Sequence, residues 1–144
     1  SLSYQAEGLS SLINGRLGSL DFKDGQWQGF LGKNLDVIIS LDSLTSINKV
    51  AMNFYQIINP WIVVPSYISI MSSKASLNWE IIKSVDSIGE IRKRGKFISS
   101  ISFDSLETDA KYLKIFAKNY GKLPSWHEAA GAESWLFIDE IIVE

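Results

Sequence analysis

The sequence contains no cysteine and only one histidine. Without cysteine the chain can form neither a disulfide nor a thiolate metal site. A single histidine excludes metal sites built from clustered imidazoles. The glycine-serine elbow of hydrolases and the glycine-rich phosphate loop are also missing, and the 16 acidic residues show no pair that marks a glycosidase centre. We therefore predict that this chain is not itself an enzyme.

The sequence also has no large excess of positive or negative charge and no long apolar run. The formal net charge is -2 at pH 7, so nothing in the overall charge attracts nucleic acid or an anionic membrane surface. No apolar run approaches the length of a membrane-spanning helix, and residues 1–20 lack the basic start and apolar middle of a signal peptide. We expect no nucleic-acid partner and no membrane insertion.

What the sequence does contain is enough apolar material for one well-packed core. Hydrophobic residues make up 46% and charged residues 21% of the 144 residues, which is typical of an ordinary soluble domain. There is no internal repeat, low-complexity tract or linker. We therefore expect a single domain over residues 1–144, with the five tryptophans divided between its core and its surface.

The hydrophobic pattern has a period of two along most of the chain. Six of the ten glycines fall within the first 34 residues, which predicts loops and turns with little regular structure there. Beyond residue 34, apolar and polar residues alternate in short runs, which is typical of strands with one face toward a core. This pattern predicts an all-β fold, an antiparallel β-sandwich with Greek-key or jelly-roll connections. The predicted strands cover residues 35–41, 49–55, 67–71, 78–85, 97–103, 111–118 and 134–143.

The last predicted strand, residues 134–143, is apolar on both of its faces. Such a strand usually lies in the middle of a sheet and is buried on both sides. Asp139 and Glu140 interrupt it, and a buried carboxylate is costly unless it has a partner. One interpretation is a calcium ion held by Glu140 together with Asn14, Asp21 and Asp24 of the glycine-rich first segment. The alternatives are an ion pair with Arg or Lys, turn amides that donate to the carboxylate, or a position beyond the covered part of the sheet.

The segment before that strand, residues 119–133, is polar, contains glycine and proline, and is predicted to be a long loop. Sugar binding needs a displayed aromatic ring for the apolar face of a pyranose and fixed polar groups for its hydroxyls. The other interpretation is that Trp126 plugs the edge of the sandwich and that His127 makes a hydrogen bond that fixes the loop. We expect Trp27, Trp79 and Trp135 to be core residues. The candidate sugar ligands are Trp126, His127, Asn119, Trp61, Tyr55 and Arg16.

Several short motifs follow one another in a specific order along the chain. They are Asn14-Gly15, Asp24 to Phe30, Leu35 to Leu41, Trp61-Ile62, Ala110 to Asn119, Leu123 to His127 and Trp135 to Ile141. Taken in this order, they resemble the motifs of discoidin-like domains, which are also called coagulation factor 5/8 type C domains. The combination also resembles the module at the C-terminal end of bacterial β-N-acetylhexosaminidases.

The resemblance implies a galactose-binding-like β-sandwich that binds glycans and is attached to a secreted, periplasmic or surface-located bacterial glycoside hydrolase. It also implies a structural calcium ion near the first loop and the closing strand. We therefore predict a non-catalytic carbohydrate-binding module. The alternative is a docking domain that packs against its own catalytic domain and binds no free sugar.

Overall fold

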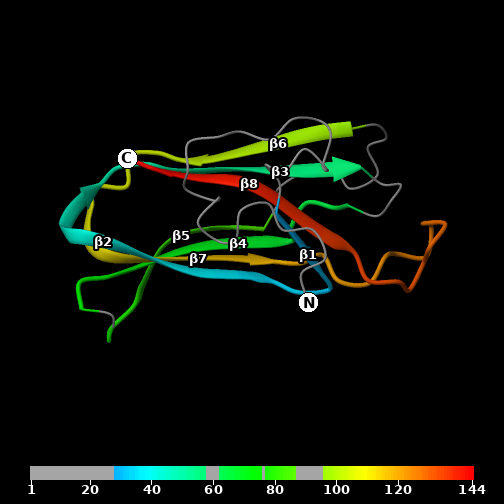
Figure 1. Ribbon diagram of the computed structural model, residues 1–144, viewed down its shortest axis with the longest axis horizontal. Helices are drawn as coiled ribbons and strands as arrows, with labels where there is room; N and C mark the ends of the chain where they lie inside the picture. The colour runs from blue at the N-terminus through cyan, green and yellow to red at the C-terminus, as the bar shows by residue number, and fades with distance from the viewer. Residues whose placement is uncertain (1–27, 58–61, 76, 87–95) are drawn as a thin grey trace.

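The computed structural model describes residues 28–57, 62–75, 77–86 and 96–144. The described chain is folded into two four-stranded antiparallel sheets that pack face to face (Figure 1). The first sheet has the order β1-β8-β3-β6, and the second has the order β2-β7-β4-β5. The predicted antiparallel β-sandwich is confirmed. The strands are β1 Gln28–Leu31, β2 Leu35–Ile47, β3 Val50–Ile57, β4 Tyr67–Ser73, β5 Glu80–Val85, β6 Lys96–Phe103, β7 Thr108–Lys118 and β8 Trp135–Val143.

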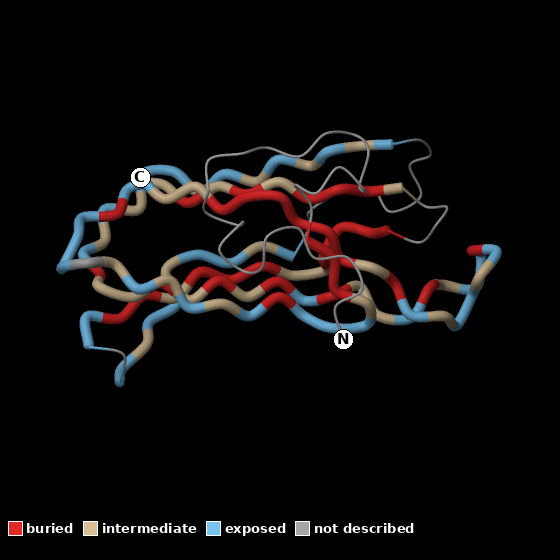
Figure 2. The backbone as a smooth tube through the Cα atoms, viewed as in Figure 1, coloured by how far each residue is buried: buried red, intermediate tan, exposed pale blue. Residues whose placement is uncertain are grey.

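The period-two pattern explains how the two sheets share one core. On β7, Leu113, Ile115 and Ala117 are fully buried, whereas the intervening Lys114 and Phe116 are only partly covered. The same alternation on the facing strands brings the inward residues of both sheets into one buried layer (Figure 2). Each fully buried leucine or isoleucine stabilises the fold by about 2 kcal/mol relative to an exposed one. The residues predicted to face inward therefore hold the sandwich together.

β8 lies between β1 and β3, as its apolar sequence predicts, and residues 136–141 are buried. The inward-facing Ile138 and Ile141 are three positions apart, but their partners on β3 are two positions apart. The extra residue makes a β-bulge, which removes both Asp139 and Glu140 from the inward face. Asn53 on β3, opposite the bulge, donates a hydrogen bond of 3.4 Å from its side-chain nitrogen to Asp139 Oδ2. Strict alternation fails at this point of β8, because the two carboxylates share a bulge.

β1 corrects the prediction that the first 34 residues lack regular structure. Gly29 pairs with Phe137 on β8, and a Cβ atom at this position would overlap the Phe137 ring. Gly29 is therefore a strand residue that lets an aromatic ring approach the backbone closely, although its composition is typical of a turn. The ring belongs to a second buried cluster of Tyr55, Ile62 and Phe137, on the opposite face of this sheet from the main core.

The outward face of the second sheet is less covered. Ile38 and Ile81 expose 57% and 61% of their surface there. Trp79, which was predicted to be a core residue, is half-buried outside both core clusters, and the Lys114 ammonium lies 5.8 Å from its ring centroid. The prediction was wrong because Trp79 precedes β5 rather than forming part of it. Among the described residues, no helix has the length and hydropathy of a membrane span.

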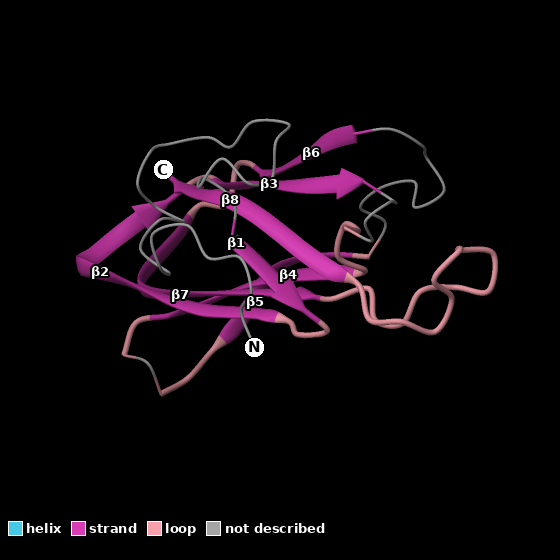
Figure 3. Cartoon of the chain, turned by 45° about the vertical axis from the view of Figure 1, so that its right-hand side comes forward, coloured by secondary structure: helices cyan, strands magenta, loops and turns pink. Residues whose placement is uncertain are grey.

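The sandwich has two ends with different contents. At the end that we call apical, Lys118 pairs with Tyr67 and Trp135 pairs with Leu31, and residues 119–134 extend beyond the strands (Figures 1 and 3). The opposite end, which we call basal, holds the turns between β2 and β3, between β4 and β5, and between β6 and β7. The last residue, Glu144, also lies there and exchanges backbone hydrogen bonds with Lys49.

Candidate functional site

Residues 119–134, here called the closing loop, form a folded arm between β7 and β8. Its two sides are joined by a bridge between Lys122 and Glu133. Two further backbone hydrogen bonds, of 2.8 and 2.9 Å, connect Leu123 with Ala132 and with Gly131. Gly131 has a φ of 86°, which favours glycine because a Cβ atom is strained there. The loop is therefore held by its own backbone, although it extends well outside the sandwich (Figure 3).

Asn119 fixes the base of the closing loop. Its side-chain nitrogen lies 3.1–3.2 Å from the carbonyl oxygens of Phe30, Lys33 and Ser134. Its Oδ1 accepts from the Gly121 N–H at 2.8 Å and lies 2.9 Å from the Ser134 hydroxyl. Asn119 is 5% exposed, so these groups are satisfied inside the protein. The prediction that Asn119 is a sugar ligand is therefore corrected, because its polar atoms join β1, β7 and β8 at the apical end.

The His127 side chain fixes the closing loop by a hydrogen bond, which is the second of the two interpretations that the sequence allows. Its Nδ1 accepts a hydrogen bond of 2.9 Å from the Ala129 N–H, and the side chain is 7% exposed. A nitrogen that accepts a hydrogen bond carries no hydrogen, so the neutral ring has its hydrogen on Nε2. The His127 N–H in turn donates to the Pro124 carbonyl at 3.0 Å. His127 thus closes two consecutive turns and shapes the segment that displays its neighbour.

Trp126 is the displayed residue of the closing loop. It keeps 40% of its surface exposed, and its ring centroid lies 5.9 Å from that of His127 at an interplanar angle of 51°. The neighbouring imidazole and the hydrogen-bonded turns restrict where this indole can lie. A partly exposed ring on a rigid support suits stacking on a flat apolar surface, because little conformational entropy is lost on binding.

The other predicted sugar ligands do not join this surface in the described structure. Tyr55 is fully buried in the second cluster, which corrects its assignment as a binding-site wall. It lies on the face of β3 that is covered, and the period-two pattern could not distinguish a covered outer face from an open one. Trp61 and Arg16 lie outside the described residues, as does Trp27. Trp135 is half-buried and packs edge-on against Phe137, with ring centroids 5.6 Å apart, as expected for a core residue.

The predicted calcium ligands are only partly described. Glu140 is 5% exposed and lies in the bulge of β8, so the predicted burial of a carboxylate in this strand is confirmed. Asn14, Asp21 and Asp24 lie outside the described residues. Within the described part of the chain, no group of three or more His, Cys, Asp or Glu side chains could hold a metal ion. A calcium site at Glu140 therefore needs oxygen ligands from the first segment, as the sequence interpretation assumed.

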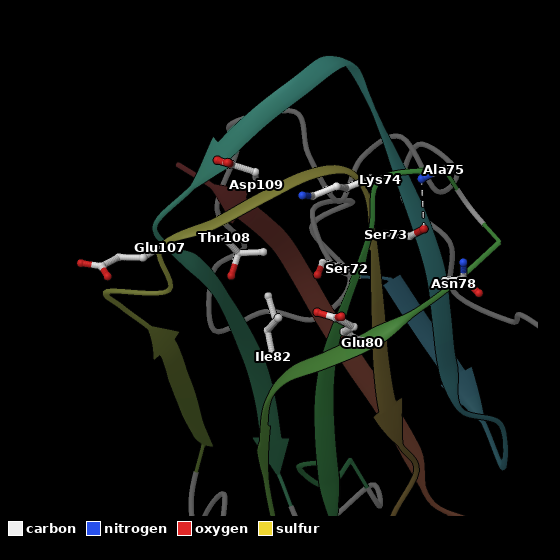
Figure 4. Close-up of a pocket in the computed structure, with 10 residues that line it drawn as sticks. All are labelled: Ser72, Ser73, Lys74, Ala75, Asn78, Glu80, Ile82, Glu107, Thr108 and Asp109. Atoms are coloured by element: carbon white, nitrogen blue, oxygen red, sulfur yellow. Dashed lines mark hydrogen bonds between the residues drawn. The ribbon is translucent and has the colours of Figure 1, made fainter.

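A pocket at the basal end of the sandwich is not predicted by the sequence pattern. Its volume is about 510 Å³, and Figure 4 shows polar side chains from β4, β5 and β7 around it. Two of these, Ser72 and Thr108, stand in register with the inward-facing Leu113 and Ile47. The sequence signal for this pocket is a polar residue at an inward-facing position near the end of a strand. This signal can be recognised only when the strand ends are known to within one residue.

Comparison with known proteins defines the fold class. No family model matches the chain, and no curated protein matches it. The chain is similar to the CBM32 domain of AlyQ in complex with 4,5-unsaturated mannuronic acid (TM-score 0.59, 16% identity, 100% of this chain and 92% of that chain). It is also similar to CBM32-1 of a family 31 glycoside hydrolase from Clostridium perfringens (TM-score 0.53, 17% identity, 98% and 89%).

A third similar structure is the C-terminal domain of a chitobiase from Bacteroides fragilis (TM-score 0.51, 13% identity, 100% and 89%). At these identities the comparison shows a shared fold, and the similarity extends over nearly the whole of each chain. The galactose-binding-like β-sandwich that the sequence resemblance implied is therefore confirmed.

Proposed function

We propose that this chain is a non-catalytic carbohydrate-binding module, with the closing loop as its binding surface and the Trp126 ring as the platform for a pyranose. The observation that carries the proposal is the 40% exposure of this indole on a loop whose base is locked by Asn119. The shared fold supports it, since one neighbour is a CBM32 domain solved with an unsaturated mannuronic acid and another was solved with N-acetylglucosamine-α-1,4-galactose.

The test is a titration of the 144-residue chain with N-acetylglucosamine, galactose and mucin glycans, followed by tryptophan fluorescence and calorimetry. A bound sugar should shift the fluorescence, and Trp126→Ala should weaken binding at least about tenfold because the stacking surface is lost. The thermal stability should change little, because Trp126 lies outside both core clusters.

Trp79→Ala is the matched control for this titration. It removes an indole that is also outside the core clusters, but at the basal end and in contact with Lys114. Sugar binding should survive this change. If Trp79→Ala abolishes binding while Trp126→Ala does not, the closing loop is not the sugar-binding surface.

We further propose that the module is accessory to a secreted, periplasmic or surface-located bacterial glycoside hydrolase of the β-N-acetylhexosaminidase type. The C-terminal domain of a chitobiase and a module of a family 31 glycoside hydrolase share its fold, which supports this assignment. The glycan partner would then be the substrate of the parent enzyme or a neighbouring polysaccharide.

Calcium is proposed as a structural ion, with Glu140 as one ligand and Asn14, Asp21 and Asp24 as the others. A buried carboxylate in a strand bulge is a suitable calcium ligand, because calcium accepts six to eight oxygens in flexible geometry. An ion that binds the folded chain raises its melting temperature, so a chelator should lower that temperature by about 5 °C or more.

Glu140→Gln should remove the effect of the chelator, whereas Glu133→Gln, which makes the same change at an exposed position, should preserve it. A melting curve that excess chelator leaves unchanged would contradict the calcium proposal.

The second candidate function is docking against the catalytic domain of the parent chain. A row of residues on the outer face of the second sheet favours docking. This row crosses the four strands in register and consists of Ile38, Lys114, Met71 and Ile81. The two isoleucines are more than half exposed, so burial against a partner would stabilise a contact there. A broad glycan array that shows no signal for the free chain would favour docking over sugar binding.

A further inference from the structure

The basal pocket lies at the basal ends of β4, β5 and β7 of the second sheet. On β4, Ile68 and Ile70 face inward into the main core, and Ser72 is the next residue on the same face. Glu80 on β5 pairs with Ser72. Thr108 opens β7 opposite the buried Ile47 of β2. The core therefore ends in a layer of hydroxyl and carboxylate groups, and the pocket of about 510 Å³ lies above that layer. This volume is within the range of small-molecule sites, roughly 300–1,000 Å³.

The polar groups of this layer are directed into the pocket. Figure 4 shows the Ser72 hydroxyl near the Glu80 carboxylate, its neighbour across the β4–β5 pair, with the Ile82 and Thr108 side chains beside them. Ser72 is only 6% exposed, and its hydroxyl makes no hydrogen bond within the described part of the chain. The rest of this side chain is covered by protein, so the hydroxyl is held in place at the pocket and can both donate to and accept from a ligand.

The charges around the pocket favour a cation. Glu80, Glu107 and Asp109 contribute three carboxylates, and Lys74 contributes one ammonium group. Between the ten lining residues, the one hydrogen bond that involves a side chain joins the Ala75 N–H to Ser73 Oγ (Figure 4). The formal charge of the lining is therefore -2, from three negative groups and one positive group, and these groups do not satisfy one another. A protonated amine is attracted to such a lining, and a carboxylate is repelled.

We propose that the basal pocket is a second binding site, at the opposite end from Trp126, that takes the protonated amino group of a hexosamine such as glucosamine. The amine donates to the Glu80 carboxylate and to the Ser72 hydroxyl. The sugar hydroxyls accept from Lys74 and bond with the Thr108 hydroxyl, whose own proton is donated to the Leu106 carbonyl at 3.1 Å. Ile82 packs against the ring carbons. The basal pocket recognises the ammonium charge and the hydroxyls of one sugar together, whereas a stacking surface such as the Trp126 ring does not.

The test compares four probes by nuclear magnetic resonance titration of the 144-residue chain at low salt: glucosamine, glucose, N-acetylglucosamine and glucuronate. Glucosamine should bind about tenfold more tightly than glucose or N-acetylglucosamine, because only glucosamine has an ammonium group. Glucuronate should be the weakest. The amide signals of Ser72, Asn78, Glu80 and Thr108 should shift with glucosamine, and Trp126→Ala should leave these shifts unchanged.

Glu80→Gln is the decisive variant, because it keeps the shape of an exposed side chain and removes its charge. It should weaken glucosamine binding about tenfold. Glu107→Gln is the matched control, since the Glu107 carboxylate points away from the other lining residues (Figure 4) and its change should weaken binding less than about threefold.

Equal binding of glucosamine and glucose, or equal losses in the two variants, would overturn the proposal. It would also be overturned if glucosamine shifted signals of the closing loop only and none of the basal pocket. The two sites can fail separately: loss of neutral-sugar binding in Trp126→Ala tests only the closing loop, and loss of glucosamine selectivity in Glu80→Gln tests only the basal pocket.

Discussion

The apical and basal ends of this sandwich are built on the same strands but expose different chemistry. At the apical end, the polar side chains of Asn119 and His127 are used by the backbone, and an indole is left displayed. At the basal end, the side chains of Ser72 and Glu80 face an open pocket and do not bond to each other. Polar residues that hold a loop are thus separated from polar residues that are available to a ligand.

The difference shows that residue type alone does not mark a binding site in this fold. Asn119 has the chemistry of a sugar ligand, but every polar atom of its side chain bonds inside the protein. Ser72 has a weaker sequence signal, but its hydroxyl remains available at the mouth of the core. The hydrogen-bond partners of a residue therefore decide between a structural and a binding role.

The largest expected effect comes from Asn119→Ala, which should break the apical end only. Loss of this side chain leaves the Gly121 N–H and several carbonyl groups without their buried partner. The free energy of unfolding should fall by about 3 kcal/mol, measured by chemical denaturation. Neutral-sugar binding at Trp126 should be lost with the loop geometry, while the folded fraction should still bind glucosamine at the basal pocket.

Asn34→Ala is the control for Asn119→Ala. Asn34 is exposed and accepts one hydrogen bond of 2.9 Å from the Asn119 N–H, so its loss should cost less than about 1 kcal/mol. Equal destabilisation by the two substitutions would show that Asn119 is not the residue that fixes the closing loop.

The smaller expected effect is the salt dependence of the two sites, which sharpens the comparison without any substitution. Raising sodium chloride from about 20 to about 500 mM should weaken glucosamine binding about fivefold, because salt screens the attraction between the ammonium and the carboxylates. Binding of a neutral sugar at Trp126 should change less than about twofold. Calorimetry at both salt concentrations measures the change in the dissociation constant of each sugar. A similar loss of affinity for both sugars would remove the chemical distinction between the two ends.

The strand pattern was predictable because burial imposes a period of two on the residues of each strand. Seven of the eight strands lie where the sequence predicts a strand, six from alternation or flanking turns and β8 from its continuous apolar run. β1 was missed because Gly29 and Gly32 have the composition of a turn, and only the Phe137 ring explains why glycine stands at position 29. Trp79 was misplaced because a residue just before a strand does not follow the alternation of that strand.

The candidate site was predictable only in part. The closing loop and its Trp126-His127 pair follow from local composition, because glycine, proline and polar residues interrupt the strand pattern. Tyr55 failed as a surface residue because a second cluster covers the outer face of β3. Asn119 failed because its partners Phe30 and Lys33 come from strand β1 and the turn after it, more than eighty positions away in the sequence.

The sequence by itself determined the class of fold, the central position of β8 and the loop that displays an indole, because hydrophobic periodicity and turn composition are local properties. The tertiary structure alone decided which polar residues are consumed by the fold, how a bulge moves Asp139 and Glu140 off the inward face, and that the core opens into a charged pocket. These outcomes depend on which distant strands become neighbours, and a pattern read along one chain contains no such distances.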